Sequence, residues 1–115
     1  MPRDIFLVST EPMTMPALVE AAVAVDGRLV PRVLFDGGAI QLVDTDDVAV
    51  ITLELSRRIA DPYQVELLVG RLPLTGSVWW TEATAPWGPA GEAGVRVGRE
   101  LAERLGARIT IEDGR

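Results

Sequence analysis

The sequence predicts a single α+β domain, and three observations support this class. Short runs of alternating apolar and polar residues are typical of strands, two longer runs with apolar residues at helical spacing are typical of helices, and turn-forming residues separate the runs. With 115 residues, 48% hydrophobic and 24% charged, the chain has the size and composition of one globular domain. We therefore expect one domain over residues 1–115, with a mixed, mostly antiparallel sheet, two long helices and one short helix.

The first strand and the first helix are predicted from the N-terminal quarter of the chain. Residues 4–10 have apolar side chains on both faces, as in a central strand that is covered on both sides. Thr14 is a typical N-cap, and Pro16 is tolerated in a first helical turn. Asp26-Gly27 ends the helix, with Gly27 expected in the left-handed conformation. One apolar stripe is expected to face the core: Met15, Leu18, Val19, Ala22 and Val25.

The middle of the chain predicts a meander of three strands. The first, over residues 29–35, contains Pro31, which is typical of an edge strand. Asp36-Gly37-Gly38 has the composition of a hairpin turn, and an acidic turn at residues 44–47 separates the other two strands. These strands cover residues 39–43 and 48–55. In the last one we expect Ala49, Ile51, Leu53 and Leu55 on one face and Val48, Val50, Thr52 and Glu54 on the other.

The C-terminal half predicts a short helix, a strand, the longest helix and a last strand. Asp61-Pro62 resembles an N-cap followed by proline, so residues 61–71 are predicted as the short helix, with a strand as the alternative. Further strands are expected over residues 77–84 and 107–111. The long helix, over residues 90–105, ends at Gly106 and is expected to pair Glu100 with Arg104 and Glu92 with Arg96. Its buried stripe is Ala90, Gly94, Val97, Leu101 and Leu105.

The resulting order of elements resembles the ferredoxin-like plan, an α+β sandwich in which two strand–helix–strand units share one sheet. This plan hosts many unrelated functions, so it implies none by itself. No set of motifs assigns the chain to a family. The core of the sandwich is predicted to contain Leu18, Ala22, Ile51, Leu53, Val97, Leu101 and Leu105.

The chain contains no His, no Cys and no Lys. These residue types supply most general bases, thiol nucleophiles, Schiff-base amines and zinc ligands. We therefore expect a protein that binds rather than catalyses, with no cofactor and no tightly bound transition metal. The absence of Cys also excludes a disulfide framework.

The formal net charge is −6 and the pI is near 4.5. An acidic domain repels phosphates and anionic lipid and attracts basic partners, so we expect a basic protein partner and neither nucleic acid nor a membrane. No apolar run is long enough to span a bilayer, and residues 1–8 do not resemble a signal peptide, which favours the cytoplasm. All the positive charge is Arg, which together with abundant Ala, Val and Gly indicates a GC-rich bacterial genome.

Two segments resemble ligand-binding loops only weakly. Residues 88–94 lie between a strand and a helix, as phosphate-binding loops do, but Pro89 has no N–H to donate and Glu92 is negatively charged. The acidic turn at residues 44–47 lacks the spacing of a calcium-binding loop. Both segments are better explained by helix packing and by turn formation.

A small-ligand site or a carboxylate-based active site is the first alternative to a protein-binding role. Ser9, Thr10 and Glu11 lie at the C-terminal end of the first predicted strand, an edge that holds ligands in open α/β sheets. Ser9 has no His or Lys to activate it, and no GxSxG motif surrounds it. Glu11 and Glu82 could act as an acid–base pair if folding brought them together. No residue is assigned a catalytic role.

The adjacent Trp79 and Trp80 are the strongest candidates for a partner-binding site. Successive side chains of a strand point to opposite faces, so we expect one ring in the core and another at least partly exposed. Trp87 follows in a proline-rich loop. We predict a partner-binding patch of Trp79, Trp80, Trp87 and Glu82. With this patch the chain would act as an accessory or neutralising partner of another protein. The second alternative is a module that self-associates through the Val48–Val50 face or an exposed strand edge.

Overall fold

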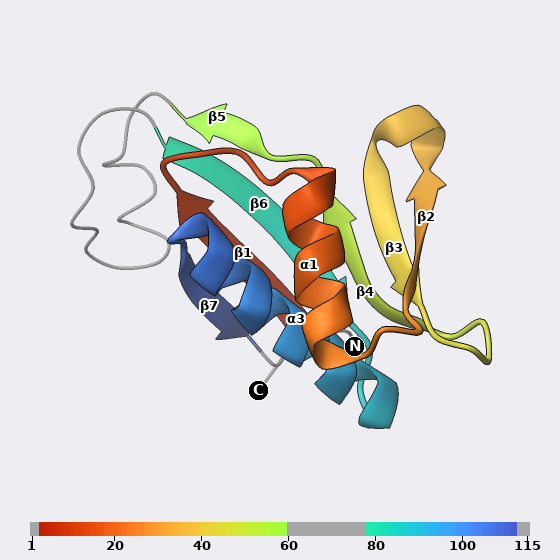
Figure 1. Cartoon of the computed structure of the whole chain (residues 1–115). Helices are drawn as coiled ribbons and strands as arrows, with labels where there is room; N and C mark the ends of the chain where they lie inside the picture. Colours follow the sequence, from red (N-terminus) through yellow and green to blue (C-terminus); the bar gives the residue numbers. More distant parts are fainter. Residues whose placement is uncertain (1–2, 60–77, 113–115) are drawn as a thin grey trace.

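The computed structural model describes residues 3–59 and 78–112, which form two layers, a seven-stranded sheet and two helices on one of its faces (Figure 1). The α+β class is therefore confirmed. The predicted short helix over residues 61–71 lies outside the described residues. The helices are α1 (Met15–Val25) and α3 (Pro89–Leu105). The strands are β1 (Arg3–Ser9), β2 (Val30–Leu34), β3 (Ala39–Val43), β4 (Ala49–Glu54), β5 (Arg57–Ile59), β6 (Val78–Ala85) and β7 (Arg108–Glu112), with the 3-10 turn η1 (Phe35–Gly37) between β2 and β3.

The strand order is β2-β3-β4-β6-β1-β7, and β5 also pairs with β6. Every pairing within the described residues is antiparallel, so the expectation of a mixed sheet is wrong. The reason is the crossover through α3, which connects two strands, β6 and β7, that lie on either side of β1 rather than next to each other. The ferredoxin-like plan is matched only in part, because a β-α-β-β-α-β order has four strands and this sheet has seven.

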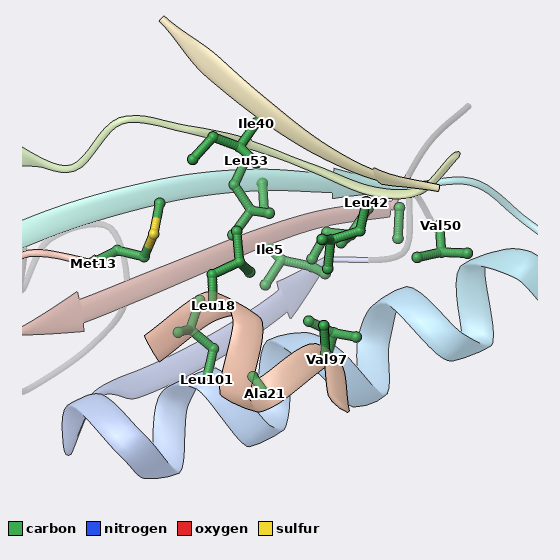
Figure 2. Close-up of a cluster of buried hydrophobic side chains, with 14 of the residues drawn as sticks. Ile5, Met13, Leu18, Ala21, Ile40, Leu42, Val50, Leu53, Val97 and Leu101 are labelled. Carbon is green, nitrogen blue, oxygen red and sulfur yellow. The ribbon is translucent and has the colours of Figure 1, made fainter. Parts of the chain in front are cut away.

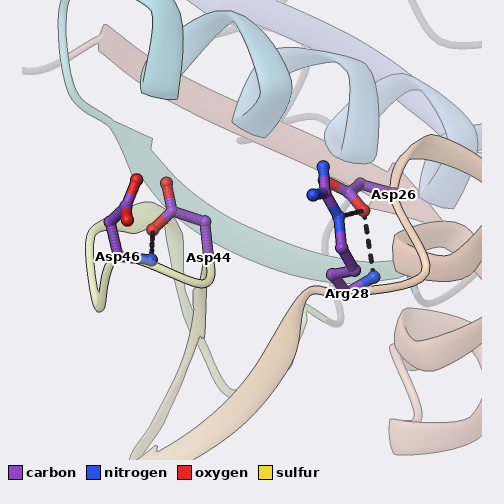
Figure 3. Close-up of polar contacts among 4 residues, drawn as sticks. All are labelled: Asp26, Arg28, Asp44 and Asp46. Carbon is purple, nitrogen blue, oxygen red and sulfur yellow. Dashed lines mark hydrogen bonds and ion pairs between the residues drawn. The ribbon is translucent and has the colours of Figure 1, made fainter.

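α1 begins as predicted and ends differently. The Thr14 hydroxyl caps the helix by accepting a hydrogen bond from the Ala17 N–H at 3.3 Å. Gly27 is not left-handed, contrary to the expectation, because the chain leaves the helix at Asp26 in an extended conformation. The Asp26 carboxylate then accepts hydrogen bonds from the backbone N–H and the guanidinium of Arg28, at 3.0 and 3.1 Å (Figure 3). A side-chain turn thus replaces the glycine cap.

The buried face of α1 is rotated away from the predicted stripe. Leu18 and Ala22 are buried as expected, and Ala21 joins them. Met15 and Val19, which were expected in the core, are 36% and 39% exposed. The helix packs chiefly against α3, and its buried side chains share one core with the sheet, so these neighbours select which of its apolar residues are covered.

The main core lies between the two helices and the sheet (Figure 2). Five residues predicted from the sequence are fully buried there: Leu18, Ile51, Leu53, Val97 and Leu101. Leu105 packs against this core and is only partly buried. Gly106 ends α3 in the left-handed conformation, as predicted.

A bulge in β4 breaks the predicted two-face pattern at Val50, whereas Ile51 and Leu53 lie on one face and Thr52 and Glu54 on the other as predicted. The register against β3 shifts so that Leu42 pairs with Ile51 and Val43 pairs with Ala49, which leaves Val50 as the extra residue. Val50 is 1% exposed and packs in the same core as Ile51. A face containing Val48 and Val50 is therefore not available for self-association.

Candidate functional site

β6 places Trp79 and Trp80 on opposite faces of the sheet, as strand geometry requires. Trp80 is 5% exposed and packs with its cross-strand neighbour Val8 in a small second cluster. Along β1, Val8 alternates with Leu7, which belongs to the main core beneath the helices. Trp80 therefore lies on the face of the sheet opposite α1 and α3, called here the far face. Trp79 is half-buried and points to the helix side.

Trp87 lies beyond the other end of β6. It is 42% exposed, and the Arg3 guanidinium carbon lies 4.8 Å from the centroid of its ring. Arg3 also contacts Glu92, with 2.7 Å between Nη2 and Oε1, in place of the expected pairing of Glu92 with Arg96. Ala85, the last residue of β6, is five residue steps from Trp80, a distance of about 17 Å along the strand. The structure thus does not bring the three Trp rings into one patch.

Glu82 is the one predicted site residue that lies directly beside a Trp on the far face. Its Oε1 accepts hydrogen bonds from the Trp80 indole N–H at 2.9 Å and from the Arg57 guanidinium at 3.0 Å. The Trp80 ring packs against Phe6, with 5.1 Å between ring centroids and 34° between ring planes. Both the carboxylate and the indole are therefore held in defined positions.

Three hollows on the far face meet at Glu82. One, of about 120 Å³, lies over β1, β4 and β6 and contains Asp4, Phe6 and Glu54 in its wall. A second is bordered by Phe6, Trp80 and Glu112, and a third by Arg57 and Trp80, and Glu82 is part of all three. We call these three adjoining hollows together the Glu82 groove; its acidic and aromatic residues are Asp4, Phe6, Glu54, Trp80, Glu82 and Glu112, and Arg57 and Arg58 border its third hollow.

The first two hollows of the Glu82 groove are suited to a cation, whereas the third is bordered by Arg57 and Arg58, and Arg57 already pairs with Glu82. The wall of the first hollow contains three carboxylates, Asp4, Glu54 and Glu82, and no basic residue. Its volume of about 120 Å³ is below the several hundred Å³ typical of metabolite sites, which suits a side-chain head group better than a whole metabolite. Within residues 3–59 and 78–112, no group of three or more acidic residues is arranged to hold a metal ion.

The strand-end residues predicted as an alternative site form a structural turn. Ser9 is fully buried, and its hydroxyl donates to the backbone carbonyl of Glu11 at 2.5 Å. Its proton is thus used within the turn. Glu11 follows the end of β1, whereas Glu82 pairs with Phe6 in the middle of that strand, and the three residue steps from Phe6 to Ser9 alone span about 10 Å. The structure does not bring the two carboxylates together.

The acidic turn uses the Asp44 carboxylate on its own backbone (Figure 3). Asp44 Oδ1 accepts hydrogen bonds from the N–H groups of Asp46 and Val48, at 2.9 and 3.0 Å. Asp47 forms an ion pair with Arg32 of β2. These contacts are those of a turn former.

The glycine-rich segment before and within α3 brings backbone segments close together. A Cβ atom built on Gly91 would lie 1.5 Å from the carbonyl oxygen of Pro86, and one on Gly94 would lie 1.8 Å from that of Val50. The glycines are therefore required by packing of α3 against β4 and against the preceding loop.

Sequence reasoning identified Trp80 and Glu82 and missed the other groove residues. Asp4, Phe6, Glu54 and Glu112 come from three different strands, β1, β4 and β7. Alternation along β1 does place Asp4 and Phe6 on one face. Only the order β4-β6-β1-β7 brings them beside Glu82.

Comparison of the chain with protein-family models, curated proteins and solved structures gave no significant match. A functional assignment therefore depends on the geometry alone. Of the helices in the described part of the chain, none is long and apolar enough to cross a membrane.

Proposed function

We propose that the protein is a non-catalytic binding module, an accessory or neutralising partner of another protein, and that its Glu82 groove receives a basic side chain of that partner. The observation that carries this proposal is the position of Glu82. Its carboxylate is shared by three adjoining hollows and is held in place by Trp80 and Arg57. A groove that is already ordered loses little entropy when it binds.

The charge of the groove favours an Arg or Lys side chain as the occupant. The carboxylates of Asp4, Glu54 and Glu112 surround Phe6 on the far face, and an opposite charge on the partner complements them. The acidic net charge of the whole chain would speed the encounter with a basic protein, most strongly at low salt.

The other predicted Trp residues have separate roles in this proposal. Trp87, exposed and stacked with Arg3, offers a second contact at the far end of β6. Trp79 supports the sheet from the helix side, where it is half-buried. Neither is needed for a basic side chain to reach Glu82.

The proposal is tested by titrating the protein with a synthetic peptide of alternating Gly and Arg and following Trp fluorescence. Glu54→Gln should weaken binding about two- to fivefold, the effect of one exposed charge pair, and adding Glu112→Gln should weaken it further. Glu103→Gln, the same change on the exposed side of α3, is the matched control and should have no effect. Raising the salt concentration should weaken binding because the charges become screened.

Two outcomes would contradict the proposed function. One is equal binding of a peptide in which Gln replaces every Arg. The other is an equal loss in the Glu103→Gln control, which would mean that only the overall charge attracts the peptide. If the groove passes both tests, capture from the host with wild-type protein and the Glu54→Gln/Glu112→Gln variant in parallel would identify the natural partner.

A further inference from the structure

The outward sides of the two helices differ in chemistry, although the helices lie beside each other on one face of the sheet (Figure 1). On α3, every exposed residue from Glu92 to Arg104 is charged. On α1, Glu20 is the one charged residue among those exposed, and the others are apolar. The exposed residues of α1 are Met15, Pro16, Val19, Glu20, Val23 and Ala24.

Three of these side chains form a continuous apolar row, which we call the α1 stripe: Met15, Val19 and Val23. They follow one another at four-residue spacing and are 36%, 39% and 60% exposed. A helix that is apolar on all sides is normally covered on all sides. The charged exposed side of α3 follows the usual pattern for a helix that faces water, and α1 departs from it.

The charges around the α1 stripe favour a second copy of this chain over a basic partner. Glu20, the nearest carboxylate, lies 3.8 Å from the guanidinium of Arg104, which also pairs with Glu100 at 2.6 Å. The neighbouring helix α3 contributes equal numbers of both signs: three Arg at positions 96, 99 and 104 and three Glu at positions 92, 100 and 103. The chain as a whole carries −6, so most self-contacts would be repulsive, but the helix side is nearly neutral. The carboxylates that would complement a basic partner lie on the far face instead.

We infer that the protein forms a two-fold symmetric dimer through the α1 stripe. Val19 is the middle residue of the stripe, so a two-fold axis near Val19 places Met15 of one copy beside Val23 of the other. The result is an apolar centre bordered by mixed charges, which is the usual composition of an interface. The Glu82 groove lies on the opposite side of the sheet and stays accessible in both copies. This inference is independent of the proposed function.

The test is the molar mass in solution, measured by analytical ultracentrifugation over a range of protein concentrations. The wild-type protein should show a concentration-dependent dimer. Val19→Glu places two like charges against each other at the two-fold axis, and Val23→Glu buries a carboxylate against Met15 of the other copy. Each variant should raise the dimer dissociation constant at least tenfold. Val30→Glu is the matched control, because Val30 is 55% exposed on β2 and lies outside the stripe, and it should change the constant less than twofold.

The interpretation requires that each variant keeps the wild-type circular dichroism spectrum and melting transition, as expected for residues that are at least 39% exposed. A wild-type protein that is monomeric at every concentration would overturn the inference. So would a dimer that both stripe variants leave intact, or one that Val30→Glu dissociates equally well. The peptide titration tests the Glu82 groove on the far face, whereas the molar mass tests the α1 stripe on the helix side. A failure of the proposed function is therefore distinguishable from a failure of the dimer inference.

Discussion

α1 and α3 lie on the same face of the sheet, yet only α3 has a sequence that defines its own orientation. In α3 the apolar and charged positions alternate with the helical period, and the predicted residues Gly94, Val97 and Leu101 are buried. In α1 nearly every position is apolar, and the predicted stripe is partly exposed. The orientation of an amphipathic helix is encoded locally, whereas an apolar helix is oriented by what it packs against.

The largest effect is expected where the two helices are equivalent, at their buried leucines. Leu101→Ala on α3 and Leu18→Ala on α1 should each lower the free energy of unfolding by about 2–5 kcal/mol, because both side chains are fully buried in one core. Chemical denaturation measures both values. A loss below about 1 kcal/mol for Leu18→Ala alone would mean that α1 is oriented differently from this description.

The next largest effect is a difference in stability between alanine variants of two glycines on the buried side of α3. Gly94→Ala should cost about 1–3 kcal/mol or more, because the new Cβ atom would meet the Val50 carbonyl oxygen at 1.8 Å. Gly98→Ala should be neutral or stabilising by up to about 1 kcal/mol, because its Cβ atom would make ordinary contacts at 3.6 Å or more and Ala favours the helix. Thermal melts of the two variants compare them directly. Equal costs would show that α3 does not approach β4 as closely as described.

A smaller effect is expected on the exposed side of α1. Val23→Gln should change the free energy of unfolding of the monomer by less than about 0.5 kcal/mol, because Val23 is 60% exposed. The measurement is a denaturation curve at a protein concentration low enough to exclude the dimer. A cost similar to that of Leu18→Ala would place Val23 inside the core and remove the contrast between the two helices.

The smallest effect concerns the C-terminal ends of the helices, where Gly106 caps α3 and Asp26 caps α1. Hydrogen bonds from Arg28 hold the pKa of Asp26 below its ordinary value of 3.8. Because the folded-state pKa is the lower one, the stabilisation is present above the unfolded-state pKa and is lost as the pH falls through the folded-state pKa. Asp26→Asn should therefore melt slightly earlier than wild type at neutral pH, and the difference should disappear in acid. A difference that persists unchanged in strong acid would contradict the role of the carboxylate charge.

The α+β class, most strand positions and the orientation of α3 follow from the sequence alone. They depend on local periodicity, on the Thr14 cap and on the glycine at position 106, which act over a few residues. The opposite directions of Trp79 and Trp80 follow from strand geometry in the same way.

The tertiary structure alone decided the antiparallel order of the strands, the buried face of α1 and the candidate site. The bulge at Val50 depends on pairing with β3, and the exposure of Val19 depends on where α3 lies. The Glu82 groove collects its acidic and aromatic residues from four strands, and no spacing along the chain encodes that β6 lies between β4 and β1. Neighbours in a sheet are chosen by long-range packing, so a site built across strands cannot be read from any one segment.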